Sequence, residues 1–146
     1  MLLFLVVFLP LFSFLVAGFA SRIPSTVLPK KSVDQLARLL TSSLLSVCAL
    51  FSLIIFTNVA VHGDAASNTI KLFSWISSGS FNVDWALKLD QLTAIMLVVV
   101  TVVSSLVHIY STGYMSEDKS IARFMSYLSL FTFFMLILVT ADNFLQ

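Results

Sequence analysis

The chain contains 146 residues, of which 59% are apolar and only 10% are charged, and its formal net charge is +1. Soluble domains carry about 25% charged residues, so this composition, with a mean hydropathy of +1.03, predicts an integral membrane protein. The near-neutral charge excludes a nucleic-acid partner held by a basic surface. No Gly-rich phosphate loop, Cys-x-x-Cys or His-x-x-x-His pattern occurs, which excludes a soluble-facing nucleotide or redox site in this chain.

The first apolar run covers residues 2–20 and predicts a membrane-spanning helix, because about 20 apolar residues cross a bilayer. No Lys or Arg precedes this run, which argues against a signal peptide. Pro24 and Pro29 predict a loop from Ser21 to Gln35, followed by a second helix over residues 36–61. The single cysteine, Cys48, lies in this second run, and we interpret it as a small packed thiol.

Residues 69–89 change character, because apolar and polar residues alternate there in two runs. The first run includes Ile70 and Leu72, the second includes Val83 and Trp85, and a Ser-Ser-Gly-Ser turn separates them. A period of two predicts strands, so we expect a β-hairpin between the second and third helices. An isolated hairpin is marginally stable in water, and we expect this one to dock on neighbouring subunits.

The third predicted helix covers residues 91–113, and one of its faces is polar. At about 100° per residue, its polar side chains fall within about 120° of the helical wheel. They are Asp90, Thr93, Thr101, Ser104, Ser105, His108, Ser111 and Thr112. Unpaired polar groups in hydrocarbon are costly, so we expect this face to lie against another helix or trapped water rather than against lipid. We expect the neighbouring helix to belong to another polypeptide.

The fourth predicted helix covers residues 121–140 and has charged residues at its ends. Asp118 lies just before it, where a carboxylate interacts favourably with the helix dipole; alternatively, Asp118 pairs with Arg123 and closes the loop. Asp142 lies at the far end, where we expect it to bond loop or hairpin backbone, as we also expect of Asp90.

The distribution of Lys and Arg predicts how the four helices are oriented. The second loop holds Lys71 and Lys88, whereas the first and third loops hold Arg22, Lys30, Lys31, Arg38, Lys119 and Arg123. Basic residues concentrate on the inner side of a membrane. The sequence therefore predicts four crossings with both ends of the chain outside, and a fold class of all-α integral membrane protein with one β-hairpin.

Several segments closely resemble a known family. They are Ser74-Trp-Ile-Ser-Ser-Gly, Leu89-Asp-Gln-Leu-Thr, Ser105-Leu-Val-His-Ile-Tyr-Ser, Gly113-Tyr-Met-Ser-Glu-Asp and Leu138-Val-Thr-Ala-Asp-Asn-Phe-Leu-Gln. They resemble the N-terminal portion of chain 5 of respiratory complex I (NADH:ubiquinone oxidoreductase), in its antiporter-like subunit family. The resemblance is dense from Phe73 to Gln146 and looser before Phe73. It is closer to mitochondrial members than to bacterial ones.

This resemblance implies a proton-translocating subunit of the membrane arm with no redox centre of its own. NADH, FMN, iron–sulfur clusters and ubiquinone would be bound by partner subunits, and lipids would surround the helices. It implies the mitochondrial inner membrane, with a bacterial plasma membrane as the alternative. Longer family members continue into a Gly-Trp-Glu segment and carry a later membrane-embedded Lys, neither of which occurs here. A second chain supplying the rest of the subunit, which we favour, or a truncated chain would each account for this.

The candidate proton-path residues lie on the polar face of the third helix: His108, Thr101, Ser104 and Ser105. An ionisable residue inside a membrane suggests function, and imidazole both accepts and donates protons near neutral pH. The alternative is that these side chains only pack neighbouring helices, in which case the chain is a non-catalytic brace of the distal membrane arm. A free-standing antiporter is disfavoured because no acid and base lie at the membrane centre. We expect no activity from this chain alone.

Overall fold

The computed structural model describes residues 2–22, 29–62, 68–79, 81–116, 118 and 120–146, with the backbone alone at 30, 62, 68 and 81. Its helices are α1 (Leu2–Ala20), α2 (Lys30–His62), α3 (Gln91–Tyr114) and α4 (Ile121–Val139), and its strands are β1 (Asn68–Ser78) and β2 (Phe81–Leu89). All four helices are long and apolar enough to cross a membrane. The predicted fold class, four membrane helices with a hairpin between the second and third, is confirmed.

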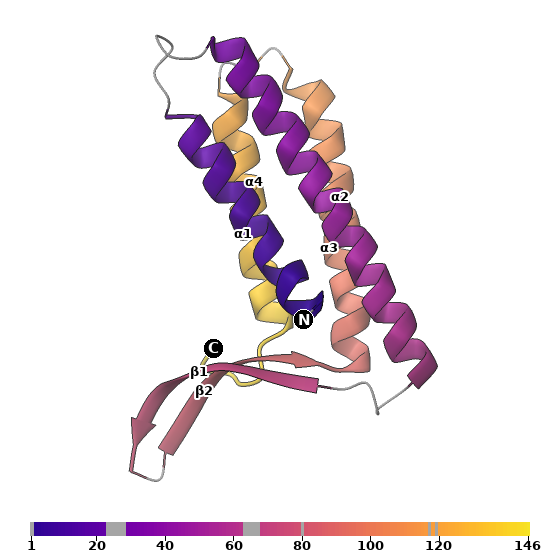
Figure 1. Cartoon of the computed structure of the whole chain (residues 1–146), viewed down its shortest axis with the longest axis vertical. Helices are drawn as coiled ribbons and strands as arrows, with labels where there is room; N and C mark the ends of the chain where they lie inside the picture. The colour runs from indigo at the N-terminus through magenta and orange to yellow at the C-terminus, as the bar shows by residue number, and fades with distance from the viewer. Residues whose placement is uncertain (1, 23–28, 63–67, 80, 117, 119) are drawn as a thin grey trace.

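The four helices run side by side, and the two ends of the bundle differ (Figure 1). The N-terminus, the β1–β2 hairpin and the C-terminus lie together at one end, which we call the hairpin end. Arg22 follows α1, Arg38 lies near the start of α2 and Arg123 lies in the first turn of α4. These three positions belong to the opposite end, which we call the arginine end.

Helix α2 is longer than the sequence pattern predicted, since it begins at Lys30 and not at residue 36. The predicted loop from Ser21 to Gln35 was therefore wrong for its last six residues. Pro29 directly precedes the helix and does not prevent it, because proline lacks only an N–H that the first helical turn leaves unpaired. Residues 23–28 of the predicted loop lie outside the described residues. The prediction followed the apolar run, whereas polar residues such as Asp34 and Gln35 extend the same helix beyond that run.

A proline inside α1 is accommodated by a side chain from α2. Pro10 is buried within α1 and has no N–H to donate to the carbonyl of Val6, four residues earlier. The Cys48 thiol donates to this Val6 oxygen, with an Sγ–O distance of 3.1 Å. Neighbouring side chains often satisfy backbone groups that proline leaves free in membrane helices. Cys48 is thus a packed thiol, as expected, with a specific hydrogen-bond acceptor.

The interior of the bundle has an apolar part and a part built from small residues. The larger cluster joins residues of all four helices and of β2: Leu3, Val6, Val7, Cys48, Ile55, Val59, Leu87, Ala94, Leu97, Val100 and Leu136. A second cluster, nearer the arginine end, consists of Ala17, Ala37 and Ala122 from α1, α2 and α4. Small residues let helix backbones approach closely, which is how membrane helices gain packing energy without a hydrophobic driving force.

The hairpin is antiparallel and contacts the end of the chain as well as the bundle. Ala86 and Leu87 of β2 are fully buried, while much of β1 is exposed. After α4 the chain runs beside β2, where the Lys88 N–H donates to the Thr140 carbonyl over 2.8 Å and Ala141 forms a bridge to Leu87. The base of the hairpin therefore docks on its own chain, and the expected docking on neighbouring subunits stays a prediction.

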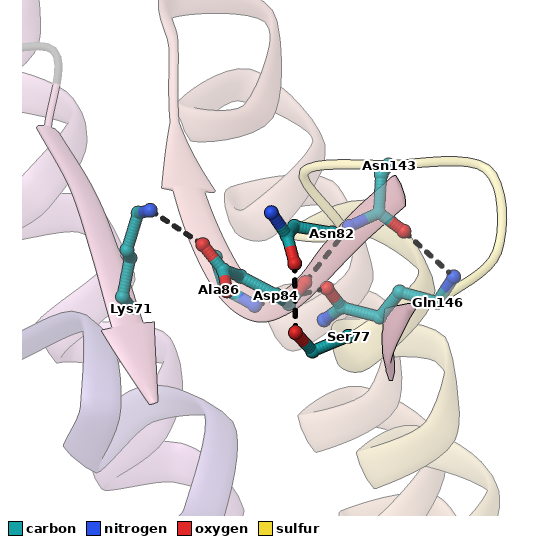
Figure 2. Close-up of polar contacts among 7 residues, drawn as sticks. All are labelled: Lys71, Ser77, Asn82, Asp84, Ala86, Asn143 and Gln146. Atoms are coloured by element: carbon teal, nitrogen blue, oxygen red, sulfur yellow. Dashed lines mark hydrogen bonds and ion pairs between the residues drawn. The ribbon is translucent and has the colours of Figure 1, made fainter. Parts of the chain in front are cut away.

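Side chains of the last residues extend this contact. The Asn143 amide donates to the Asp84 carbonyl over 2.9 Å, and the Ala86 N–H donates to Oε1 of Gln146 over 3.1 Å (Figure 2). The C-terminal segment thus satisfies backbone groups along the edge of β2 that would otherwise be open to pairing with another strand.

Candidate functional site in the helix bundle

The polar face of α3 lies inside the bundle. Thr101, Ser105, His108 and Ser111 are buried, and their neighbours Ser104 and Thr112 are half-buried. The hydrogen-bond partners of this face come from α2 and α4 of the same chain, as the following distances show. The expectation that another helix covers this face is therefore confirmed, whereas the expectation that this helix belongs to another polypeptide was wrong. The reason is that α2 and α4 carry matching hydroxyls, which a helical wheel of α3 alone does not reveal.

His108 occupies the centre of these contacts and is 0% exposed. Its Nδ1 lies 2.8 Å from the carbonyl oxygen of Ser104, one turn earlier in α3. Its Nε2 lies 3.2 Å from Oγ of Ser129 on α4. Since a carbonyl only accepts, Nδ1 carries a proton and donates it to Ser104, so in the neutral imidazole Nε2 is an acceptor for the Ser129 hydroxyl.

Hydroxyls continue from both sides of the imidazole. On the Nε2 side, Oγ of Ser129 lies 3.3 Å from Oγ of Ser13 on α1. On the Nδ1 side, Oγ of Ser104 lies 3.5 Å from the ring nitrogen and 2.6 Å from Oγ1 of Thr132 on α4. We call these five residues the imidazole seam. The seam links α1, α3 and α4 through groups that can each donate and accept a proton.

Two further hydroxyl pairs join α3 to α2. Thr101 and Ser52 lie 2.7 Å apart through their side-chain oxygens, and both are fully buried. Thr112 and Ser42 lie 3.1 Å apart nearer the arginine end. Ser105, by contrast, donates to the Val102 carbonyl of its own helix over 2.9 Å. Of the four candidate proton-path residues, Ser104 and His108 belong to the seam, Thr101 forms a separate pair and Ser105 bonds only within α3.

The charged residues at the helix ends make local contacts. Asp118 accepts from the backbone N–H and the hydroxyl of Ser120, both over 2.7 Å, and these hydrogen bonds hold the pKa of Asp118 below its ordinary value. Within the described residues the ion pairs are Lys71–Asp84 and Lys88–Asp90. The alternative that Asp118 pairs with Arg123 is therefore wrong, since the nearer Ser120 donors occupy the carboxylate.

At the hairpin end, Asp90 and Asp142 were both expected to bond backbone groups. Asp90 precedes α3 without a side-chain capping bond and instead pairs with Lys88, with 3.2 Å between Nζ and Oδ2. Asp142 is exposed, and the backbone contact in the tail comes from the next residue, Asn143. The expectation therefore fails for Asp90, because a lysine side chain lies within reach of its carboxylate.

Sequence reasoning missed the partners that complete the seam. Ser13, Ser129 and Thr132 lie in apolar runs, where single hydroxyls usually back-bond to their own helix. One signal was available on α4, because Ser126, Ser129 and Thr132 recur every three residues and mark one face of that helix. No comparable pattern marks Ser13, which is a single polar residue in α1.

The side chains of this site suit proton transfer and not metal binding. In the described part of the chain, no group of three or more His, Cys, Asp or Glu side chains comes together. The imidazole of His108 is the titratable side chain in the seam, and an imidazole can both accept and donate a proton. The hydroxyls around it can orient to donate or to accept, as a relay or a packing network would require.

Comparison with known proteins adds the family. The family described as NADH-ubiquinone oxidoreductase (complex I), chain 5 N-terminus, matches residues 75–125. The NADH-quinone oxidoreductase subunit L of Rickettsia bellii is 52% identical over 143 residues, covering 97% of this chain and 21% of the relative. The NADH-ubiquinone oxidoreductase chain 5 of Arabidopsis thaliana is 46% identical over 142 residues, covering 97% and 20%. The chain thus spans about a fifth of the length of the curated relatives it matches.

Four apolar helices around a buried polar seam are the architecture of a multi-pass membrane protein. The chain belongs to the family of complex I chain 5 and NADH-quinone oxidoreductase subunit L, and its residues 75–125 match the N-terminal part of chain 5. The similarity extends over nearly the whole chain, including α1 and α2, where the sequence motifs alone indicated a looser match. Bacterial relatives are at least as similar as plant ones, so the expected closeness to mitochondrial members was wrong.

Proposed function

We propose that this chain forms a four-helix part of the membrane arm of proton-pumping NADH:ubiquinone oxidoreductase and contributes to proton translocation coupled to quinone reduction. Its relatives carry the names of subunits of that enzyme. In this proposal the other membrane-arm subunits are its partners, and they and the hydrophilic subunits hold NADH, FMN, iron–sulfur clusters and ubiquinone. The membrane is the mitochondrial inner membrane, or the plasma membrane of a bacterium.

In this proposal the chain acts together with the other four fifths of the subunit. The chain spans about a fifth of its relatives, and family members place a buried Glu and a Lys in later segments. Peptide mapping of the purified complex shows where those segments lie. A peptide that continues past Gln146 without a break places them on the same polypeptide, and peptides from a separate chain with its own N-terminus place them on a second one.

The observation that carries the proton-path role is the contact set of His108. In its neutral form, the imidazole donates from Nδ1 to the Ser104 carbonyl and accepts at Nε2 from Ser129. When a proton arrives at Nε2, both nitrogens become donors, and the Ser129 hydroxyl can turn to the Met125 carbonyl, 3.0 Å away. The surroundings of His108 therefore satisfy both protonation states with one hydroxyl rotation, as a relay residue requires.

The complete set of hydrogen bonds around His108 also favours a second function. His108 has a partner for each nitrogen, and Ser13, Ser129 and Thr132 tie α1, α3 and α4 together. Satisfied polar networks in membrane bundles stabilise helix association by about 0.6 to 2 kcal/mol per bond. In this second candidate function the seam is a brace, and the chain holds the distal membrane arm together without moving protons.

Replacing His108 in the assembled complex separates the two functions. His108→Gln keeps an amide donor and acceptor but cannot take up a proton, whereas His108→Leu removes both abilities. A general acid–base group contributes about 10²–10⁴-fold to a proton transfer, so the proton path predicts that His108→Gln lowers proton export per NADH oxidised. The measurement is proton uptake by vesicles containing the complex, with NADH oxidation followed in parallel.

Assembly of each variant is followed on native gels, and Ser105→Ala is the matched control because Ser105 bonds only within its own helix. The proton path is supported if His108→Gln assembles fully and exports fewer protons while Ser105→Ala is unchanged. Normal export from an assembled His108→Gln complex, together with failed assembly of His108→Leu, would establish the brace instead.

A further inference from the structure

The structure contains a groove that neither candidate function uses. It lies between α1 and α4 at the arginine end and has a volume of about 620 Å³, within the range of about 300–1,000 Å³ for ligand sites in proteins. One wall comes from Leu15 and Phe19 of α1 and the other from Tyr127 of α4. Phe19 and Tyr127 are 71% and 65% exposed, so the apolar walls open outward from the bundle.

Two cations line the same groove. Arg22, just after α1, and Arg123, in the first turn of α4, both line it, and both are exposed. The ion pairs of the described residues, Lys71–Asp84 and Lys88–Asp90, lie at the opposite end and involve neither arginine. Two guanidinium groups at one mouth repel each other unless an anion lies between them, and guanidinium groups match phosphate oxygens in geometry and charge.

The floor of the groove is polar but already satisfied. Ser21 donates to the Gly18 carbonyl over 2.7 Å, and Ser126 donates to the Phe14 carbonyl over 3.3 Å. These hydroxyls do not compete for a ligand's phosphate, which leaves the arginines as its ligands. Gly18 makes the floor open, since a side chain there would point at Ser126.

We propose that this groove binds an anionic phospholipid, with the phosphate between Arg22 and Arg123 and an acyl chain along Leu15, Phe19 and Tyr127. Basic pockets between membrane helices commonly hold anionic lipid headgroups. A membrane helix from another subunit fits this groove less well, because it would bury two arginines without supplying a negative charge. Free phosphate also fits less well, because it would leave the apolar walls uncovered. Only a lipid would both neutralise the two arginines and cover the apolar walls.

The test compares lipid binding to the full chain, extracted in mild detergent with any subunits that remain attached. Spin-labelled phosphatidylglycerol and spin-labelled phosphatidylcholine are the probes, and electron paramagnetic resonance measures the motionally restricted fraction of each. A Lys or Arg near an anionic lipid surface contributes about fivefold in binding. We expect a preference for phosphatidylglycerol of about fivefold to 25-fold, which falls to near one in Arg22→Gln/Arg123→Gln.

Two variants make the test specific for the groove. Lys31→Gln removes an exposed cation near the start of α2, outside the groove, and should leave the preference unchanged. Leu15→Trp fills the groove from an exposed position without altering charge, and should abolish the preference while circular dichroism shows the helices intact. Arg22→Lys/Arg123→Lys should retain most of the preference.

Several outcomes would overturn the proposal. They are equal binding of the two lipids by the unaltered chain, loss of the preference in Lys31→Gln, and full preference in Leu15→Trp. Millimolar inorganic phosphate that displaces the restricted lipid completely would indicate an ion site instead. A cross-link from the variant Phe19→Cys to a partner polypeptide, in place of lipid, would show that a protein covers the groove.

Discussion

At the scale of single residues, the bundle depends on side chains that satisfy groups another helix leaves open. Pro10 leaves the Val6 carbonyl of α1 without its helical donor, and the Cys48 thiol of α2 donates to that carbonyl instead. His108 needs partners on both ring nitrogens, and Ser104 and α4 supply them. In hydrocarbon no water replaces a lost partner, so each such pair fixes how two helices are rotated against each other.

The pairing of Cys48 with the carbonyl freed by Pro10 gives a testable coupling. Cys48→Ala removes the donor to Val6 and should lower the free energy of unfolding by about 1 kcal/mol. Pro10→Ala restores an N–H within α1, so in the double variant the loss of the thiol should cost less. Unfolding in mixed detergent, followed by circular dichroism, measures the double-mutant cycle. Cys48→Ser, which keeps a donor, is the control, and strict additivity of the two changes would contradict the assignment.

At the scale of elements, helices α1 and α4 pack closely where small residues meet. A Cβ on Gly18 would lie 3.1 Å from Oγ of Ser126, which is closer than ordinary van der Waals contact, so Ser126 would have to shift by a few tenths of an ångström. The hairpin, in contrast, holds together through stacking and an ion pair at its surface. Trp85 packs against Phe73 and Trp75 with ring centroids 5.8 and 5.4 Å away.

The close approach at Gly18 predicts an asymmetry between two helical glycines. Gly18→Val should lower the free energy of unfolding by about 1–3 kcal/mol, because overpacking at this contact forces α1 and α4 apart. Gly113→Ala should be neutral or stabilise by up to about 1 kcal/mol, since nothing lies within 4 Å of its new methyl group. Thermal unfolding in detergent measures both variants. Equal destabilisation by the two would show that close packing at Gly18 is not the cause.

The hairpin should lose stability at high pH. Lys71 forms an ion pair with Asp84 across the two strands, and this hydrogen bond and charge raise the pKa of Lys71 above its ordinary 10.5. A raised pKa contributes stability that is present below pH 10.5 and is lost as pH rises through the folded value. Trp75 and Trp85 are the two tryptophans of the chain, so their emission during denaturant unfolding reports on the hairpin.

In the variant Lys71→Gln this alkaline loss should be absent. The pair lies at the surface and is screened by solvent, so we expect a small shift of the unfolding midpoint. An unaltered chain whose midpoint follows that of Lys71→Gln at every pH would show that the pair contributes nothing.

At the scale of the whole molecule, the chain is a closed bundle with an apolar outside. Large side chains such as Phe12, Leu106 and Phe131 are more than half exposed and suit lipid or neighbouring subunits. The seam inside has no such exposure, since Ser13, His108 and Ser129 are all nearly or fully buried. A pump needs access to each side of the membrane in turn, with a change in affinity between two states.

For this reason the chain reconstituted alone should not move protons. Liposomes containing only the purified chain, loaded with a pH-sensitive dye and given a pH gradient, should collapse that gradient no faster than protein-free liposomes. The burial of Ser13 and Ser129, which end the Nε2 branch of the seam inside the bundle, is the physical reason. Flux well above that of protein-free liposomes, and abolished by His108→Leu, would mean that the seam alone is a conducting path.

The sequence by itself determined the four helices, the hairpin and the polar face of α3, because length and hydrophobic period fix these locally. Only the tertiary structure decided what covers that polar face. Ser13 and Ser129 lie 116 positions apart in the chain, and their meeting depends on how α1 and α4 are rotated and how deep each lies. The same holds for the thiol at Val6, the tail along β2 and the groove with its two arginines. Each brings together residues that are far apart in the chain, and their separation in sequence does not reveal that they are close in space.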